Sequence, residues 1–269
     1  MRHTGQYLLE ISRHPFRRLI PAGWILLQRL AKHMPASIRQ DVEGCGHGEA
    51  VELEFDPESL WDEEPPEVQR PRLLPIGASN SLATMLAKKA SGPVVGFIVE
   101  GPTAGGHNAP PRGQRIENEQ GEPLYTERDM VDLEKLARLG LPFWLAGGAG
   151  RPGALRRARE AGAQGIQVGT LFAFCEESGL EPGIKASVVE QSVTEEVDVL
   201  TDGRASPTGF PFKVVQMGDS LASAEVYEKR ERICDLGYLR TAYRQPNGRL
   251  GFRCPAEPVE TYVKKGGAR

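Results

Sequence analysis

The stretch LPFWLAGGAGRPGALRRAREAGAQGIQVGT, residues 141–170, decides the fold because it contains one complete strand–helix–strand repeat. LPFWLA is a short apolar run that predicts a buried strand, and a turn at Gly147 and Gly148 ends it. RPGALRRAREAGA predicts a helix, and GIQVGTLFAF predicts the next strand, over residues 165–174. Neither strand alternates between apolar and polar residues, so the repeat predicts a parallel sheet covered on both faces.

The same repeat extends upstream as far as Arg72. RLLPIGASN and VVGFIVEG predict strands, SLATMLAKKAS predicts a helix capped by Ser81, and ERDMVDLEKLARLG predicts a helix that ends at Gly140. Four βα units therefore lie between Arg72 and Phe174, whereas a full (β/α)8 barrel has eight units in about 250 residues. The sequence predicts an α/β fold that is a partial TIM barrel. We expect a fragment of a longer protein rather than a half barrel that needs a partner.

Three regions are predicted along the chain. Residues 1–71 form a helical segment over Gln6–Ala36, followed by a linker with a possible edge strand at Val51–Phe55. Residues 72–179 form the barrel part. Residues 180–269 form an irregular extension that packs on the barrel, and the letters PNG within it are a hairpin signal.

Composition excludes several classes of protein. The 269 residues are 39% hydrophobic and 26% charged, which is typical of a globular protein with a sizeable core. The longest apolar runs are too short to span a bilayer and the N-terminal residues lack a signal-peptide pattern, so we expect a cytoplasmic protein without a membrane partner. A formal net charge of -3 gives no electrostatic reason to bind nucleic acid, so we expect a small-molecule substrate. The four cysteines lack the CxxC spacing of a zinc site, so we expect no metal, while the oligomeric state stays open.

Glycine-bearing turns follow three of the four predicted strands, at Glu100–Gly101, Gly147–Gly148 and Gly169–Thr170. Ligands bind at the carboxyl ends of parallel strands, so these turns should line one site. Glycines let the backbone approach an anion, a following helix offers free N–H groups, and the Thr170 hydroxyl is a further donor. The last two turns together indicate a phosphate site. The alternative is that their glycines only permit tight turns.

His107 follows the predicted strand at residues 94–101, in the loop PTAGGHNAPPRG. The two glycines before it permit close approach to a ligand, and the loop leaves the same edge of the sheet as the two phosphate turns. An imidazole can take a proton from a carbon acid or donate one to an oxygen. We therefore interpret His107 as a catalytic residue, the alternative being a structural histidine.

Three segments together resemble a known family: EGPTAGGHNAPPRG, PFWLAGGAG and GAQGIQVGTLFAFCEESG. Their ordered combination is similar to that of the nitronate monooxygenase (2-nitropropane dioxygenase-like) family, whose relatives include flavin-dependent enoyl-acyl carrier protein reductases. The resemblance covers roughly residues 72–179, and the downstream segments TGFPFKV, RICDLGYLR and GFRCP resemble a longer bacterial branch. It implies an FMN-binding TIM barrel, of which this chain holds about the last four βα units.

The resemblance also implies roles for single residues. The family's histidine falls on His107, as the general base that removes the proton alpha to a nitro group. Glu100 and Gly101 match positions that approach the flavin. Glutamine is common in the family at the first of these positions, so Glu100 puts the flavin contact or the class of substrate in question. The positions implied to bind the FMN phosphate are Gly147, Gly148, Gly169 and Thr170.

The expected activity is therefore that of an FMN-dependent oxidoreductase, a monooxygenase that oxidises alkyl nitronates or related carbon acids. One alternative is an NAD(P)H-dependent flavin reductase acting on an enoyl thioester or a quinone. Others are a flavin-free barrel that acts on a sugar phosphate, and a catalytically incomplete fragment with little stable FMN binding. Arg112 is either a ligand for an anionic substrate or a solvated loop residue.

Overall fold

The computed structural model describes residues 29–30, 32–43, 50–63, 72–90, 93–114, 116–194, 197–203, 205, 210–233, 241–254 and 256–267. The described residues fall into two compact units. Those between 70 and 222 form one unit, and those before residue 70 and after residue 222 form the other. The helix expected over Gln6–Ala36 lies mostly outside the described residues.

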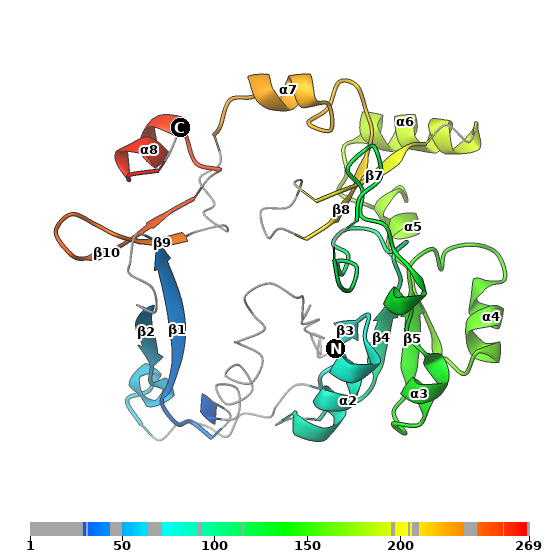
Figure 1. The fold of residues 1–269 in the computed structure, drawn as a ribbon, viewed down its shortest axis with the longest axis horizontal. Helices are drawn as coiled ribbons and strands as arrows, with labels where there is room; N and C mark the ends of the chain where they lie inside the picture. The colour runs from blue at the N-terminus through cyan, green and yellow to red at the C-terminus, as the bar shows by residue number, and fades with distance from the viewer. Residues whose placement is uncertain are drawn as a thin grey trace. The chain divides into compact units, whose positions relative to one another are not determined.

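The unit between residues 70 and 222 is built on a parallel four-stranded sheet, which confirms the parallel sheet predicted from the apolar runs (Figure 1). The strands lie side by side in chain order, as expected for consecutive right-handed βα units. They are β3 (Ile76–Gly77), β4 (Phe97–Glu100), β5 (Phe143–Ala146) and β6 (Gly165–Gln167).

Helices connect these strands and bury one apolar face each. The connections contain α2 (Asn80–Lys89), the 3₁₀ turn η3 (Glu127–Asp129), α3 (Leu133–Ala137) and α4 (Ala154–Glu160). Figure 1 shows the three α-helices arranged along the sheet. The side chains they bury against the strands form the core of this unit. Its largest fully buried apolar side chains are Leu86, Leu136 and Phe143.

Two helix ends differ from those predicted. Ser79, not Ser81, caps α2, because its Oγ accepts the N–H of Leu82. The helix predicted from residue 127 to Gly140 is divided, since Asp132 caps the start of α3 by accepting the N–H of Lys135. Ser79, Ser81 and Asp132 are all residues that can cap a helix, and the sequence alone does not show which of them does so.

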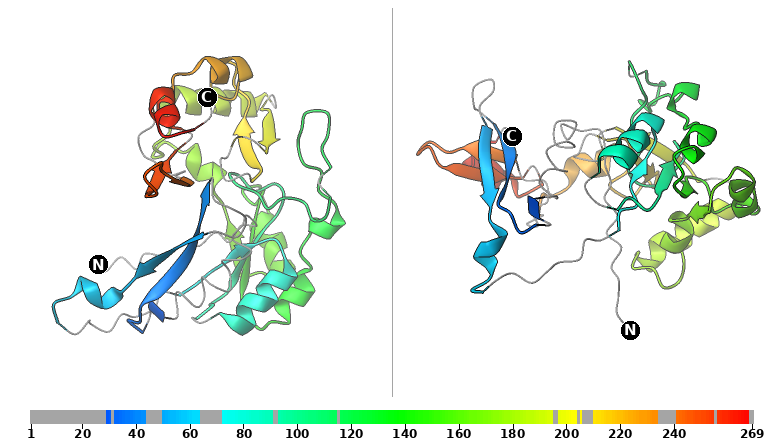
Figure 2. Two further views of the ribbon diagram at one scale, coloured as in Figure 1. Left: turned by 60° about the vertical axis from the view of Figure 1, so that its left-hand side comes forward. Right: turned by 90° about the horizontal axis from the view of Figure 1, so that it is seen from below.

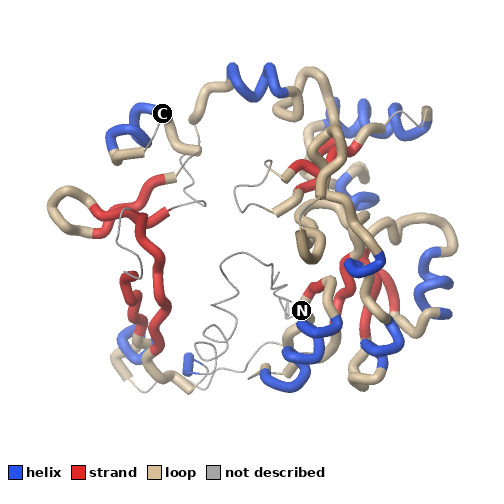
Figure 3. Tube along the Cα trace, viewed as in Figure 1, coloured by secondary structure: helices blue, strands red, loops and turns tan. Residues whose placement is uncertain are grey.

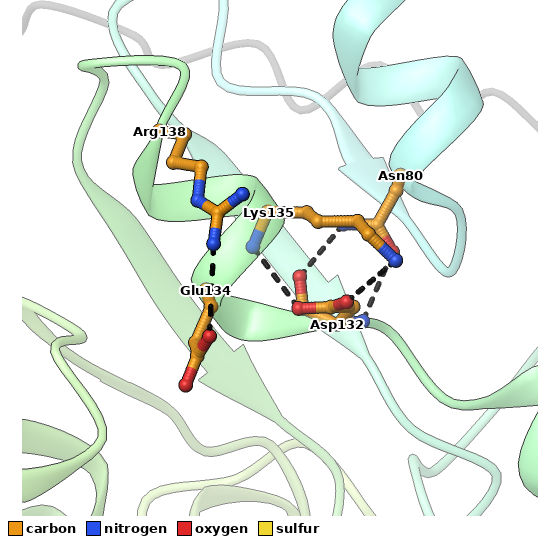
Figure 4. A network of polar contacts seen from close by, with 5 residues as sticks. All are labelled: Asn80, Asp132, Glu134, Lys135 and Arg138. Atoms are coloured by element: carbon orange, nitrogen blue, oxygen red, sulfur yellow. Dashed lines mark hydrogen bonds and ion pairs between the residues drawn. The ribbon is translucent and has the colours of Figure 1, made fainter.

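Asn80 and Asp132 join the starts of α2 and α3 (Figure 4). The Asn80 Nδ2 donates to the Asp132 carbonyl over 2.7 Å, and the Asp132 N–H donates to Asn80 Oδ1 over 2.9 Å. The Asp132 carboxylate also pairs with Lys135 Nζ over 2.8 Å. The two reciprocal hydrogen bonds between Asn80 and Asp132 hold the N-terminal ends of α2 and α3 together, on the side of the sheet where the strands have their carboxyl ends.

The strand expected to run to Phe174 is shorter. β6 ends at Gln167, and the following residues form the short helix α5 (Thr170–Ala173) and then α6 (Pro182–Val193). Gly169 is the N-cap of α5, so the chain turns at the glycine that was predicted to form the second phosphate turn. An apolar run does not by itself distinguish a buried strand from a short helix, which is why the boundary was wrong.

The extension predicted to be irregular contains regular elements. β7 (Val199–Asp202) and β8 (Phe212–Val215) form an antiparallel pair in the same unit as the parallel sheet. Both strands are rich in β-branched residues, which favour extended backbone. The segment was missed because Asp202 in β7 and Lys213 in β8 interrupt the kind of apolar run that located β4 and β5.

The second unit contains a mixed four-stranded sheet in the order β10–β9–β1–β2; Figure 3 draws these strands, like all the others, in red. β1 (Ala36–Glu43) pairs antiparallel with β2 (Ala50–Phe55) and parallel with β9 (Thr241–Arg244). β2 confirms the edge strand predicted there, whereas β1 was assigned to the end of a helix and to a linker. The remaining elements of the unit are η2 (Pro57–Leu60), α7 (Ala224–Lys229), β10 (Leu250–Arg253) and α8 (Val259–Lys264).

The predicted hairpin joins β9 and β10, which can be followed in Figure 2. Gly248 has a φ of 80°, and the Asn247 side chain accepts the N–H of Arg249 over 3.0 Å. A glycine and an asparagine are the residues that such a turn requires. No helix among the described residues is long and apolar enough to cross a membrane.

Candidate functional site

The loop after β4 turns back over the end of β5. The Gly101 N–H donates to the Ala146 carbonyl over 3.1 Å, and the Ala104 N–H donates to the Gly101 carbonyl over 3.0 Å. The first bond continues the parallel ladder by one residue, and the second closes a tight turn. Because of this turn, Thr103 and Ala104 lie beside the glycine turn of the neighbouring strand.

The turn after β5 needs its two glycines. Gly147 has a φ of 98° and Gly148 a φ of 62°, a region that residues with a Cβ rarely adopt. A Cβ at Gly147 would lie 3.0 Å from the Ala104 nitrogen and 3.1 Å from Thr103 Oγ1. The glycines therefore allow two loops to approach more closely than side chains would permit.

The turn after β6 joins the same group of residues. A Cβ built on Gly105 would lie 3.3 Å from Thr170 Oγ1, so the loop after β4 also contacts the start of α5. Gly148, Gly169 and Thr170 are exposed, and a Cβ on Gly169 would meet no atom within 4 Å. The three predicted turns thus lie next to one another and present an open backbone surface at the carboxyl ends of the strands.

His107 is half-buried and pairs with β8. It forms an antiparallel bridge with Phe212, and the two rings lie 4.8 Å apart at an interplanar angle of 86°. The Asn108 N–H donates to the Pro211 carbonyl over 2.8 Å, and the Lys213 N–H donates to the Gly106 carbonyl over 2.9 Å. The backbone on both sides of the histidine is therefore fixed by one strand.

A hollow lies at the carboxyl ends of β3 and β4. Its wall includes residues from the turn after β3, from the strand end at Glu100 and from the loop after His107, although His107 is not itself one of the lining residues. The polar members are Ser79, Glu100, Asn108, Arg112, Tyr125 and Asp129.

Arg112 ties this loop to the rest of the unit. Its guanidinium donates to the Ala78 carbonyl, and its N–H donates to Asp129 Oδ1 over 2.6 Å. Asp129 is buried and also accepts the N–H of Thr126 over 2.8 Å. Burial opposes ionisation of Asp129, but the hydrogen bonds from Thr126 and Arg112 and the charge of Arg112 hold its pKa below the ordinary value. These contacts give Arg112 a structural role that neither interpretation included: it is half-buried rather than a solvated loop residue, and it lines the hollow.

Three polar residues at the site carried no recognisable signal in the sequence. Asp129 anchors the loop from a 3₁₀ turn that was predicted to be part of a helix. Asn108 is 2% exposed and donates to the Ala104 carbonyl, while its Oδ1 has no hydrogen-bond partner among the described residues. The buried Oε1 of Gln167, at the end of β6, likewise has no hydrogen-bond partner among the described residues. Within the described part of the chain, no three histidine, cysteine or acidic side chains are grouped as a metal site would require.

Known proteins with similar sequences or folds were compared with this chain. The family model described as nitronate monooxygenase matches residues 68–207, which is more than half of the chain. A curated protein named "Probable nitronate monooxygenase", from Staphylococcus haemolyticus (strain JCSC1435), is 28% identical over 123 residues, covering 45% of this chain and 33% of that protein. The structure of the FabK (M276A) mutant from Thermotoga maritima is 25% identical to this chain, with a TM-score of 0.39. The match covers 59% of this chain and 48% of the FabK chain. The chain spans a third of the length of the curated relative.

Proposed function

Because this chain belongs to the nitronate monooxygenase family, we propose that it acts as an FMN-dependent oxidoreductase on alkyl nitronates or related carbon acids. The supporting observation is the convergence of three strand ends, at which a histidine-bearing loop lies against two glycine turns. In this proposal the four parallel strands are the last four of a TIM barrel, whose ligands bind at the carboxyl ends.

His107 is the proposed general base. Its imidazole nitrogen takes the proton from the carbon alpha to the nitro group, and the electron pair of the broken C–H bond stays on the substrate as the nitronate. The two hydrogen bonds that flank His107 keep its backbone in one conformation. A fixed base lowers the entropic cost of reaching the geometry for proton transfer.

The phosphate of FMN is proposed to bind at the glycine turns. A Cβ on Gly147 or Gly148 would lie 3.1 or 3.4 Å from Thr103 Oγ1, so glycine leaves space there that a side chain would fill. A Cβ on Gly169 would meet no atom within 4 Å. Thr170 lies beside Gly105 and is exposed, so its hydroxyl is available to an anion at the same place. These residues fit a phosphate group.

Glu100 and Gly101 are the proposed contacts to the flavin ring. Both line the hollow between the ends of β3 and β4, next to the glycine turn of β5. When bound, FMN supplies the electron acceptor that no side chain of a protein provides. The chain's own part is to present the His107 imidazole to the acidic carbon of the substrate.

The test is a pair of histidine variants assayed with FMN in excess, after the affinity of the chain for FMN has been measured by fluorescence titration. His107→Asn should lower the turnover of a nitroalkane by about 100-fold or more and leave FMN affinity unchanged, since general bases contribute roughly 10²–10⁴ in rate. His33→Asn is the control, because His33 lies in the other unit with a φ of 51° that asparagine tolerates.

Anaerobic reduction of the bound flavin distinguishes the two proposed classes of oxidoreductase. Reduction by the nitroalkane supports the proposal. Rapid reduction by NAD(P)H alone would instead indicate the flavin reductase, and unchanged nitroalkane turnover in His107→Asn would contradict the role of the histidine.

A further inference from the structure

Phe212 and its neighbours, which pack on His107, lie downstream of the residues matched by the family model, in the segment TGFPFKV. The family match ends at residue 207, whereas β8 begins at Phe212. Yet β8 pairs with the backbone on both sides of the histidine. A part of the chain downstream of the matched residues is therefore built into the proposed active site.

β8 fixes both the backbone and the ring of His107. Two backbone hydrogen bonds flank the histidine: the Lys213 N–H donates to the Gly106 carbonyl over 2.9 Å, and the Asn108 N–H donates to the Pro211 carbonyl over 2.8 Å. The Phe212 ring then lies 4.8 Å from the imidazole and nearly perpendicular to it. This edge arrangement is a favoured geometry for aromatic pairs, so the contact stabilises the observed orientation of the imidazole.

β8 is itself held by polar contacts that begin at Lys213, the residue after Phe212. The Lys213 ammonium donates to the hydroxyl of Thr201, a buried residue of β7. The Thr201 N–H donates to Glu122 Oε1 over 2.8 Å, and Asn118 Nδ2 donates to Glu122 Oε2 over 2.8 Å. The strand that carries Phe212 is thus connected to two other parts of the unit and can serve as a rigid support.

We propose that Phe212 is a positioning residue that orients the His107 imidazole for proton transfer. The inference rests on the proposed function of His107. It leaves the proposed proton transfer to the imidazole unchanged. Phe212 touches neither substrate nor flavin in this proposal; it acts through the histidine alone.

The first test is spectroscopic and needs no turnover. The chain has five histidines, and His107→Asn identifies the ring resonances of His107 by their loss. In the unaltered protein, nuclear Overhauser contacts should connect the Phe212 and His107 rings, and their absence overturns the proposal even if Phe212 variants fail to fold. Phe212→Leu removes the ring current and should shift the His107 resonances, whereas Phe212→Tyr should restore them.

The second test is kinetic. Phe212→Leu should lower kcat by up to about 100-fold, the scale of loss for a misplaced reacting group, with little change in KM, and Phe212→Tyr should recover most of the rate. Phe252→Leu is the matched control, since Phe252 is 41% exposed in the other unit.

The two proposals fail in different ways. Shifted His107 resonances with an unchanged kcat in Phe212→Leu show a merely structural contact and overturn the positioning role. If His107→Asn keeps full activity, the proposed function fails, and the positioning role fails with it, although the ring contact stays visible by resonance.

Discussion

The loop after β4 and the glycine turns after β5 and β6 meet at one site but are built in opposite ways. The loop from Gly101 to Arg112 is held by hydrogen bonds to Ala146, Pro211 and Asp129, which belong to three other parts of the unit. In the glycine turns Gly148 and Gly169 are exposed, and Gly169 has open space where a Cβ would be.

The difference fits a division between a reacting group and a binding surface. A group that transfers a proton must be held in one position before the substrate arrives. A surface that binds an anion needs unobstructed N–H groups, and rigid side chains over it would be a hindrance. Substitutions in the loop and at the residues that contact it should therefore cost stability, whereas those at Gly169, in the turn after β6, should cost only ligand affinity.

The largest effect on stability is expected for Asp129→Asn. The amide would face the N–H groups of Arg112 and Thr126 with a donor in place of an oxygen, so the free energy of unfolding should fall by about 3 kcal/mol at pH 7. Urea denaturation measures this loss. Glu127→Gln, an exposed change in the same 3₁₀ turn, should alter it by less than about 0.5 kcal/mol.

The pH dependence of the same experiment follows from the lowered pKa of Asp129. A carboxyl group whose pKa is lower in the folded chain stabilises the fold above its ordinary pKa, and this stabilisation is lost as the pH falls through the folded value. The gap between the native protein and Asp129→Asn should therefore shrink below about pH 4. A gap that stays constant down to pH 2 would show that the carboxylate charge is unimportant.

A smaller loss is expected for Gly147→Ala. Alanine would be strained at a φ of 98°, and its Cβ would crowd the Ala104 nitrogen, so unfolding should become easier by about 2 kcal/mol. Gly121→Ala separates the two causes, since Gly121 has a φ of 81° and nothing within 4 Å of its Cβ position. Equal losses in the two variants would mean that the close approach of the loops contributes nothing.

The smallest effect on stability is expected for Gly169→Ala. The free energy of unfolding should change by less than about 0.5 kcal/mol, because the new methyl group meets no protein atom. FMN affinity should nevertheless fall in a fluorescence titration, since the methyl group would project from the proposed phosphate turn. Gly179→Ala, an equally open position after α5, should leave affinity unchanged. Equal affinities in both variants would argue against a phosphate at Gly169.

The sequence predicted those parts of the site that depend on local patterns. Apolar runs located β4 and β5, and the glycines after them located the turns that the structure brings together. The position of His107 at the end of a strand was likewise readable from its neighbours. Its chemical role, and those of the glycines, stay predictions.

The supports of the site could not be predicted, because they come from distant segments. Nothing around Phe212 indicates that its ring lies against His107, and Asp129 has the appearance of an ordinary residue in a helix. Such contacts depend on how the elements pack, which local propensity does not encode. The parallel pairing of β1 with β9 was missed for the same reason.

This pairing has a consequence for synthesis of the chain. β1 and β2 leave the ribosome before β9 and β10, which complete their sheet only after nearly two hundred further residues. At about 5–20 residues per second this is a delay on the order of 10–40 s. A two-stranded ribbon is marginally stable alone, and its free edge can pair with other chains. The nascent protein is therefore most exposed to misassembly before the C-terminal strands arrive, so chaperone binding should matter most in this interval.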